Sequence, residues 1–265
     1  MSDILSEIVA NKRAEVEHRQ RQTSLAELKA SSRDQPPTRD FLGPLRGAPP
    51  LRLIAEVKKA SPSAGLIRAD FDPVEIALAY AIGGATCLSV LTDGPYFQGD
   101  LSYLRLIRQR VSLPLLRKDF IVDPYQIYEA RVAGADAVLL IAECLSPAQL
   151  REYYELARSL SMAVLTELHD LDNLEAVLAS GTELIGVNNR DLRTFRVDTQ
   201  QTVRIRQQIP RDRLVVGESG VTDRSLVVQW QAAGVDAMLV GETLMRKRDL
   251  TAAVRELLGL GSAEE

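Results

Sequence analysis

The feature that most constrains the fold is an alternation of short aliphatic runs with longer amphipathic stretches, which begins at Leu51 and continues almost to the end of the chain. Short apolar runs suit parallel strands that are buried on both faces, and the stretches between them have helical spacing. The eight expected strands are residues 51–57, 87–91, 114–117, 137–141, 163–168, 184–187, 214–218 and 237–240. The expected helices are residues 73–82, 101–110, 124–133, 147–160, 171–179, 199–208, 223–233 and 249–258.

Helix starts and recurring glycines favour closure of these units into a barrel. Several helices open with a capping side chain followed by proline, as at Asp72, Asp123 and Ser146. A helix end, a glycine and a new strand recur about every 50 residues, the length of two strand and helix units, at Gly84, Gly134, Gly181 and Gly234. We therefore predict an α/β fold, a (β/α)8 TIM barrel. An open doubly wound sheet is the alternative, but the glycine fingerprint expected after its first strand is absent.

The chain is expected to be a single domain, residues 1–265, because TIM barrels routinely occupy this length. Residues 1–47 have helical spacing of their own and precede a stretch rich in proline and glycine, so they form an N-terminal helical extension.

Composition limits the partners and the compartment. A net charge of −4 provides no broad basic surface, so nucleic acid and anionic membranes are not expected as partners. Cys87 and Cys144 lie in or beside apolar runs without a CxxC pattern, which is typical of buried thiols in a reducing compartment. No signal peptide and no apolar run of roughly 20 residues is recognisable. We expect a cytoplasmic protein, and a monomer.

Ionisable residues end four of the odd-numbered strands, where a buried strand should be apolar. They are Glu56, Lys58 and Lys59, then Arg117, Lys118 and Asp119, then Glu167, and then Glu218. In a barrel all of these positions lie at the C-terminal mouth, where catalytic groups converge. A single charged residue there is most simply a solvated strand end. Four such strands together favour acid–base chemistry, because crowded acids and lysines have displaced pKa values.

A phosphate site is indicated by residues 217–220 (GESG) and 240–243 (VGET), which follow the last two strands. Glycines let backbone N–H groups approach an anion, and a short helix opening near Glu242 would direct its positive end towards it. Glycines in simple turns are the alternative. Residues 188–191 (NNRD) follow the sixth strand and either face the same mouth or form a surface turn, about equally probable from composition.

Metal chemistry is not expected, because His18 and His169 lie far apart without ligand spacing. Trp230, Tyr153 and Tyr154 fit helix faces that pack on a core. No cofactor is implied.

Over nearly the whole chain the sequence resembles the indole-3-glycerol phosphate synthase family. The segments that carry the resemblance are residues 54–63 (IAEVKKASPS), 89–92 (SVLT), 96–97 (YF), 117–121 (RKDFI), 166–167 (TE), 186–192 (GVNNRDL), 217–220 (GESG) and 240–245 (VGETLM). Residues 8–13 (IVANKR) and 39–41 (RDF) resemble that family's helical extension, which lies over the barrel mouth.

The resemblance implies ring closure of 1-(2-carboxyphenylamino)-1-deoxyribulose 5-phosphate, with loss of carbon dioxide and water, in tryptophan biosynthesis. It implies that Lys118 is the general acid on the ketone oxygen, that Lys58 holds the carboxylate, and that Glu167 is the partner acid or base. It assigns orientation and polarisation of the intermediate to Glu56, Asn188 and Glu218. It assigns contacts with phosphate or substrate edges to Ser61, Arg190, Ser219, Gly220 and Gly241, and contacts with the aromatic ring to Phe97 and Leu239.

One departure from the family concerns Glu242, where some relatives have serine. Only its backbone N–H is expected to help bind phosphate, with the carboxylate pointing away. Two other functions stay open: an aminoaldose-phosphate isomerase, which would be expected to use a cysteine and aspartate pair, and a non-catalytic phosphate-ligand sensor.

Overall fold

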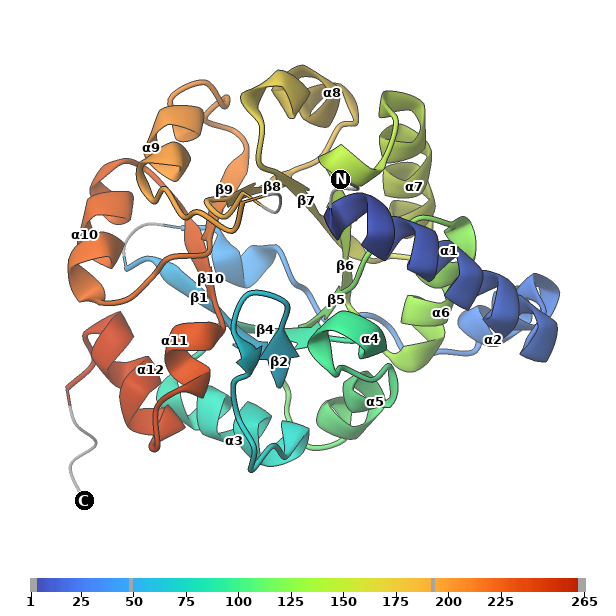
Figure 1. Cartoon of the computed structure of the whole chain (residues 1–265), viewed down its shortest axis with the longest axis horizontal. Coiled ribbons are helices and arrows are strands. Elements are labelled where there is room, and N and C mark those ends of the chain that lie inside the picture. Colours follow the sequence, from blue (N-terminus) through green and yellow to red (C-terminus); the bar gives the residue numbers. More distant parts are fainter. Residues whose placement is uncertain (1–3, 48–49, 192–193, 262–265) are drawn as a thin grey trace.

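Eight parallel strands form a closed barrel in the order β1-β10-β9-β8-β7-β6-β5-β4, with helices around it (Figure 1). The computed structural model describes residues 4–47, 50–191 and 194–261; Leu192 of the motif after the sixth strand lies outside these ranges. The barrel strands are β1 (Arg52–Val57), β4 (Cys87–Leu91), β5 (Leu115–Lys118), β6 (Ala137–Ile141), β7 (Ala163–Leu168), β8 (Leu184–Asn188), β9 (Leu214–Glu218) and β10 (Ala237–Val240). The predicted TIM barrel is confirmed, and the open sheet is excluded.

The surrounding helices begin where capping residues were expected. Asp72, Asp123 and Ser146 each accept a hydrogen bond from a backbone N–H of the first turn. The outer helices are α3 (Pro73–Gly83), α5 (Ser102–Arg108), α6 (Pro124–Ala133), α7 (Pro147–Ser159), α8 (Leu174–Ala179), α9 (Gln200–Arg206), α10 (Arg224–Ala232) and α12 (Leu250–Leu258). Shorter elements are β2 (Ala60–Ser61), β3 (Gly65–Leu66), α4 (Gly94–Phe97), α11 (Glu242–Met245) and the 3-10 turns η1 (Gly43–Leu45), η2 (Ala142–Cys144) and η3 (Leu171–Asn173). None of the helices in the described ranges combines the length and apolar character needed to cross a bilayer.

Alternation along the strands creates two apolar layers. In β1, Leu53 and Ala55 belong to the core between the strands and the outer helices, whereas Ile54 belongs to the core inside the barrel. The interior core continues with Leu116, Leu139, Leu165, Val216 and Leu239 from other strands. Beyond this apolar plug, the next inward positions of β1, β5, β7 and β9 carry ionisable side chains. Apolar side chains therefore fill the middle of the barrel, and the ionisable side chains lie at one end of it.

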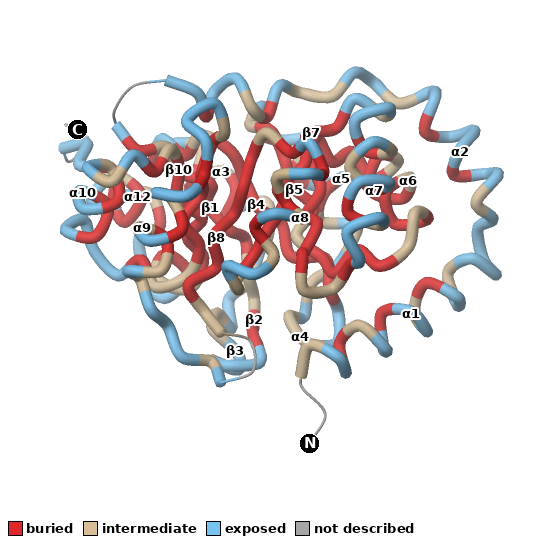
Figure 2. Tube along the Cα trace, turned by 90° about the horizontal axis from the view of Figure 1, so that it is seen from above, coloured by how far each residue is buried: buried red, intermediate tan, exposed pale blue. Residues whose placement is uncertain are grey.

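The N-terminal extension contacts both ends of the barrel (Figure 2). Helix α1 (Ile4–Gln22) begins at the mouth, where Ile8 joins the interior core, and runs outward past α6, on which α2 (Leu25–Arg33) packs. The chain then runs to the opposite end, where the Arg39 backbone N–H donates to Asp136 Oδ1 at 2.7 Å. Phe41 and Leu45 complete the interior core there. The extension therefore reaches the mouth with α1 and closes the bottom of the barrel with its last residues.

Candidate active site

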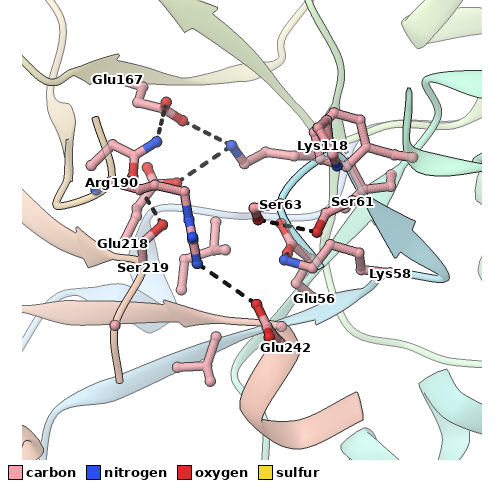
Figure 3. A pocket seen from close by; sticks show the side chains of 18 of the residues that line it. Glu56, Lys58, Ser61, Ser63, Lys118, Glu167, Arg190, Glu218, Ser219 and Glu242 are labelled. Atoms are coloured by element: carbon pink, nitrogen blue, oxygen red, sulfur yellow. Dashed lines mark hydrogen bonds and ion pairs between the residues drawn. The ribbon is translucent and has the colours of Figure 1, made fainter. Parts of the chain in front are cut away.

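A cavity of about 530 Å³ opens at the C-terminal ends of the strands (Figure 3). Its walls include all of the residues expected to act on or bind the substrate: Glu56, Lys58, Ser61, Phe97, Lys118, Glu167, Asn188, Arg190, Glu218, Ser219, Gly220, Leu239, Gly241 and Glu242. Helix α1 adds Ile4 and Ile8 to the rim. The structure therefore brings the expected residues of separate strands together around one opening.

Lys118, at the end of β5, lies between two carboxylates on the wall of this cavity. Its Nζ lies 2.8 Å from Glu167 Oε2 on β7 and 3.5 Å from Glu218 Oε2 on β9. Glu167 and Glu218 are 3% and 2% exposed, so water screens these charges poorly. The three side chains form a buried ion cluster with one cation and two acids (Figure 3).

Burial and mutual charge move the pKa values of the two glutamates in opposite directions. Burial would raise the pKa of Glu167, but the charge of Lys118, followed by hydrogen bonds from Lys118 and Asn188, lowers it below its ordinary value. Burial raises the pKa of Glu218 well above its ordinary value, and the charge of Glu167 raises it further against the opposing effect of Lys118. For Lys118, burial lowers the pKa, but Glu167 and then Glu218 and Glu56 more than offset this and raise it. Of the two acids, Glu218 therefore keeps its proton to higher pH, whereas Glu167 loses its proton first and faces the charged Lys118.

A second acid and lysine pair lies at the end of β1. Lys58 Nζ lies 2.8 Å from Glu56 Oε2, and both residues line the cavity, Glu56 from within β1 and Lys58 from the position directly after it. Alternation along β5 turns Arg117 away from the mouth, although it precedes Lys118 directly. Arg117 is fully buried and pairs with Asp119 and with Glu129 of α6. The expectation that Arg117 marks the rim is therefore wrong.

Asn188, at the end of β8, connects the ion cluster to the neighbouring loops. Its Nδ2 donates to Glu167 Oε1 at 2.9 Å, and its Oδ1 accepts from Ser219 Oγ at 2.9 Å and from the Arg190 backbone N–H at 3.0 Å. The amide orientation is therefore fixed, with its donor side towards the carboxylate. The interpretation of residues 188–191 as a surface turn fails for Asn188, which is buried.

The loops after β9 and β10 form another part of the wall, with Gly220, Gly241 and Glu242. Contrary to our expectation, the Glu242 carboxylate does not point away from the cavity. It lies 3.6 Å from Arg190 Nη2 (Figure 3). It also accepts hydrogen bonds from Arg246 Nε and Nη2 at 3.1 and 2.8 Å. Two cations therefore hold this carboxylate among the residues expected to bind phosphate.

Gly217 serves packing rather than anion approach. A Cβ at Gly217 would lie 2.3 Å from Trp230 Cζ3 on α10, so the missing side chain makes room for this ring. Gly241 is different, because a Cβ there would lie 2.3 Å from Glu56 Oε2 inside the cavity. Gly220 and Gly241 therefore fit the proposed phosphate site. Gly217 does not, because the space left by its missing side chain is filled by Trp230.

Apolar residues form the remaining wall. The rings of Phe97 and Phe120 have centroids 6.1 Å apart, and Leu239 lies on the same cavity. Sequence reasoning missed Phe120, although it lies two residues after Lys118 and the strand alternation could have suggested it. Sequence reasoning also did not assign Ile8, Leu139 and Arg246 to the site. Of these, only Ile8 belongs to an apolar pattern with helical spacing. In the described parts of the chain, no group of three or more His, Cys, Asp or Glu side chains is arranged to hold a metal ion.

Ionisable side chains from several strands at the C-terminal mouth of a closed parallel barrel define the class of TIM-barrel enzymes. Comparison with known proteins specifies the family. The family model described as indole-3-glycerol phosphate synthase matches residues 5–257. The chain is 57% identical over 255 residues to the indole-3-glycerol phosphate synthase of Rhodopirellula baltica, covering 96% of this chain and 98% of the relative. It is 52% identical over 251 residues to that of Acidithiobacillus ferrooxidans, covering 93% and 95%. The chain belongs to the indole-3-glycerol phosphate synthase family.

Solved structures of other proteins share the fold at low sequence identity. A crystal structure of 3-hexulose-6-phosphate synthase superposes with a TM-score of 0.64 at 16% identity, covering 79% of this chain and 99% of that chain. A thiamine phosphate pyrophosphorylase from Pyrococcus furiosus gives a TM-score of 0.57 at 17% identity, covering 79% and 95%. These two similarities support the barrel fold alone.

Proposed function

We propose that this chain acts as an indole-3-glycerol phosphate synthase, a carboxy-lyase of tryptophan biosynthesis. The reaction converts 1-(2-carboxyphenylamino)-1-deoxyribulose 5-phosphate into indole-3-glycerol phosphate, carbon dioxide and water. The observation that carries the proposal is the position of Lys118 between Glu167 and Glu218, within a cavity that also holds the expected phosphate loops. Family membership makes this chemistry the one to test.

The first step forms a bond between the aromatic carbon that bears the carboxylate and the ketone carbon of the sugar chain. Negative charge develops on the ketone oxygen, and Lys118 donates a proton to it. A raised pKa suits this role, because the donor must be protonated when the substrate arrives. Lys58, paired with Glu56, holds the substrate carboxylate until carbon dioxide leaves and restores the electron pair to the ring.

The second stage removes the former ketone oxygen as water. Glu167 takes a proton from the intermediate, since its lowered pKa keeps it ionised as a base. Because the pKa of Glu218 is raised by burial and by the charge of Glu167, this group keeps its proton to higher pH and can donate it towards the departing hydroxyl group. Asn188 fixes the direction of the Glu167 carboxylate. The site therefore supplies both a proton acceptor, Glu167, and a proton donor, Glu218, within one ion cluster.

The other residues of the cavity wall are assigned to the two ends of the substrate, the aromatic ring and the phosphate. Phe97 and Leu239 contact the aromatic ring, while Ser61 and Ser219 bind polar edges. Arg190 and the backbone N–H groups of Gly220, Gly241 and Glu242 bind the phosphate. These assignments place the phosphate at the loops after β9 and β10, with the ring towards the apolar wall.

The function is tested by mixing the purified protein with the anthranilate-derived substrate and following indole fluorescence, without added metal or nucleotide. Lys118→Ala is expected to abolish turnover while product still raises the melting temperature. Lys29→Ala is the matched control, because Lys29 lies on α2 against the Tyr128 ring, outside the cavity. Product binding without turnover by the wild-type protein would contradict the proposal and support a sensor. An active Lys118→Ala variant would contradict the role of this lysine.

We further propose that the chain acts as a monomer on its phosphorylated substrate. The support is that the assigned site residues all line one cavity, so the proposed chemistry needs no residue from a second copy. Analytical ultracentrifugation at micromolar concentration should give a single species close to 29.2 kDa. A stable dimer with the cavity at its interface would be evidence against this proposal.

A further inference from the structure

Lys12 of helix α1 is a buried lysine to which sequence reasoning gave no role. It is 2% exposed, and its Nζ lies 2.8 Å from Asp93 Oδ2, 2.9 Å from Asp119 Oδ1 and 2.8 Å from Glu15 Oε2. Burial by itself would lower the pKa of Lys12, but Asp119 and Asp93 raise it above the ordinary lysine value. A lysine is almost never fully buried unless its charge is compensated, so these contacts are essential to the placement of α1.

The ion pairs of Lys12 continue into a closed ring of alternating charges that joins α1 to the barrel. The members, in order, are Lys12, Glu15, Arg19, Glu129, Arg117 and Asp119, which returns to Lys12. Helix α1 contributes three of them, α6 contributes one, and the end of β5 contributes the other two. The ring attaches α1 at two places, through Arg19 on α6 and through Lys12 at the mouth.

The two aspartates that meet at Lys12 hold the backbones of two cavity-lining segments. Asp93 Oδ1 accepts from the Tyr96 backbone N–H at 2.9 Å and caps α4, which ends at Phe97. Asp119 Oδ1 accepts from the Phe120 backbone N–H at 2.8 Å, and Asp119 directly follows Lys118. One ammonium group therefore lies between the two supports of the aromatic wall, beside the proposed general acid.

Helix geometry adds a further connection to the cavity. Ile4, Ile8 and Lys12 are spaced four residues apart, so they share one face of α1. Ile4 and Ile8 line the cavity, and Lys12 lies on the same face one turn further along. Docking of Lys12 on the two aspartates thereby sets how the apolar end of α1 lies over the mouth.

We infer that Lys12 is a positioning residue, which couples the docking of α1 to the placement of Phe97, Phe120 and Lys118. It acts through Asp93 and Asp119 and does not touch the substrate. Without the ammonium group, the two buried carboxylates repel each other, and the segments that they support separate. The kinetic part of this inference rests on the proposed function, whereas the structural coupling does not.

The test compares Lys12→Met with Arg19→Met. Both substitutions remove a cation from the same helix and the same ring, but Arg19 contacts Glu15 and Glu129 rather than the two segments. Lys12→Met should lower kcat/KM at least tenfold, with most of the change in KM, because the aromatic wall binds the ring. Arg19→Met should lower the melting temperature but leave kcat and KM within twofold of wild type.

Hydrogen–deuterium exchange provides a reading that needs no turnover. In Lys12→Met, the backbone N–H groups of Gly94, Tyr96 and Phe97 and of residues 120–121 should exchange at least tenfold faster, and in Arg19→Met they should keep the wild-type rate. If Lys12→Met does not fold, Lys12→Met combined with Asp93→Asn removes one repelling charge and keeps a capping oxygen. That variant should fold, and because the ammonium group that joins the two segments is still missing, its KM should remain above the wild-type value.

The inference is overturned if the folded Lys12 variant keeps kcat/KM within threefold of wild type, or if exchange in the two segments is unchanged. It is also overturned if Arg19→Met produces the same kinetic loss, since that result would indicate general destabilisation. Wild-type protein without turnover would refute the proposed function instead, and the exchange comparison would still decide the coupling.

Discussion

Gly217→Ala tests whether this glycine is required for packing or for the phosphate. A Cβ at this position would lie 2.3 Å from Trp230 Cζ3 and 2.6 and 2.7 Å from Cε3 and Cη2, whereas ordinary contact begins at 3.4 Å. The ring would have to retreat by about 1 Å, yet it is fully buried and its Nε1 donates to the Thr199 carbonyl oxygen at 3.2 Å. Overpacking of this kind costs about 1–3 kcal/mol of unfolding free energy. For a chain of this size that corresponds to a melting temperature lower by roughly 2–12 °C.

The assay is thermal and urea unfolding followed by circular dichroism, in a double-mutant cycle with Trp230→Phe. The smaller ring leaves room for the new methyl group, so Gly217→Ala should cost at least about 1 kcal/mol less in the Trp230→Phe background. Gly261→Ala is the matched control, because a Cβ there meets no atom within 4 Å. Its unfolding free energy should change by less than about 0.5 kcal/mol.

Product affinity separates the two explanations of Gly217. Because the missing side chain faces Trp230 and not the cavity, the dissociation constant of indole-3-glycerol phosphate should change less than threefold in Gly217→Ala. An unchanged melting temperature, or an equal cost in both Trp230 backgrounds, would refute the packing argument. A large loss of product affinity without a loss of stability would show that Gly217 contributes to the phosphate site.

Three further substitutions address the acids of the cavity. Glu167→Gln should lower kcat by about 10²-fold or more while product affinity changes less than tenfold, as measured by indole fluorescence and calorimetry; equal losses would contradict an acid–base role. Because the folded protein raises the pKa of Glu218, wild-type stability should fall as pH rises above the ordinary glutamate range, and Glu218→Gln should show a smaller fall between pH 5 and 8 in thermal scans. Glu242→Gln releases Arg190 and Arg246, so inorganic phosphate should inhibit about threefold to tenfold more strongly; weaker inhibition would show that Glu242 supports the anion.

The barrel could be predicted from the sequence because each buried parallel strand is a continuous apolar run. The expected and observed strands differ by a residue at their ends, as at Leu51 before β1 and Lys118 in β5. The β2 and β3 pair escaped prediction, since two-residue strands carry no periodic signal. The path of the extension to the bottom of the barrel was also hidden, because it depends on contacts such as Arg39 with Asp136, 97 positions apart.

The location of the site was predictable for a different reason, namely that an ionisable side chain at an apolar strand end is conspicuous. Period-two alternation explains why Lys118 reaches the cavity and Arg117 does not. No such rule identifies Lys12, because a lysine on an amphipathic helix looks like a solvated residue until its partners are known. The orientation of Glu242 was misjudged for a similar reason, since Arg246 lies one helical turn further on, at the C-terminal end of α11, and its ion pair changes where the carboxylate points.

The opposite behaviour of Glu167 and Glu218 shows what the sequence alone cannot specify. Both are glutamates near the C-terminal ends of barrel strands, β7 and β9, and both are almost completely buried. Their oxygens lie 2.8 and 3.5 Å from the same Lys118 Nζ, and Asn188 donates a hydrogen bond to Glu167. Two acids so close to one cation cannot both ionise easily, so these small differences decide which one keeps its proton. The pKa values of two identical side chains are therefore shifted in opposite directions, and the asymmetry of their surroundings is what the barrel contributes to the proposed acid–base chemistry.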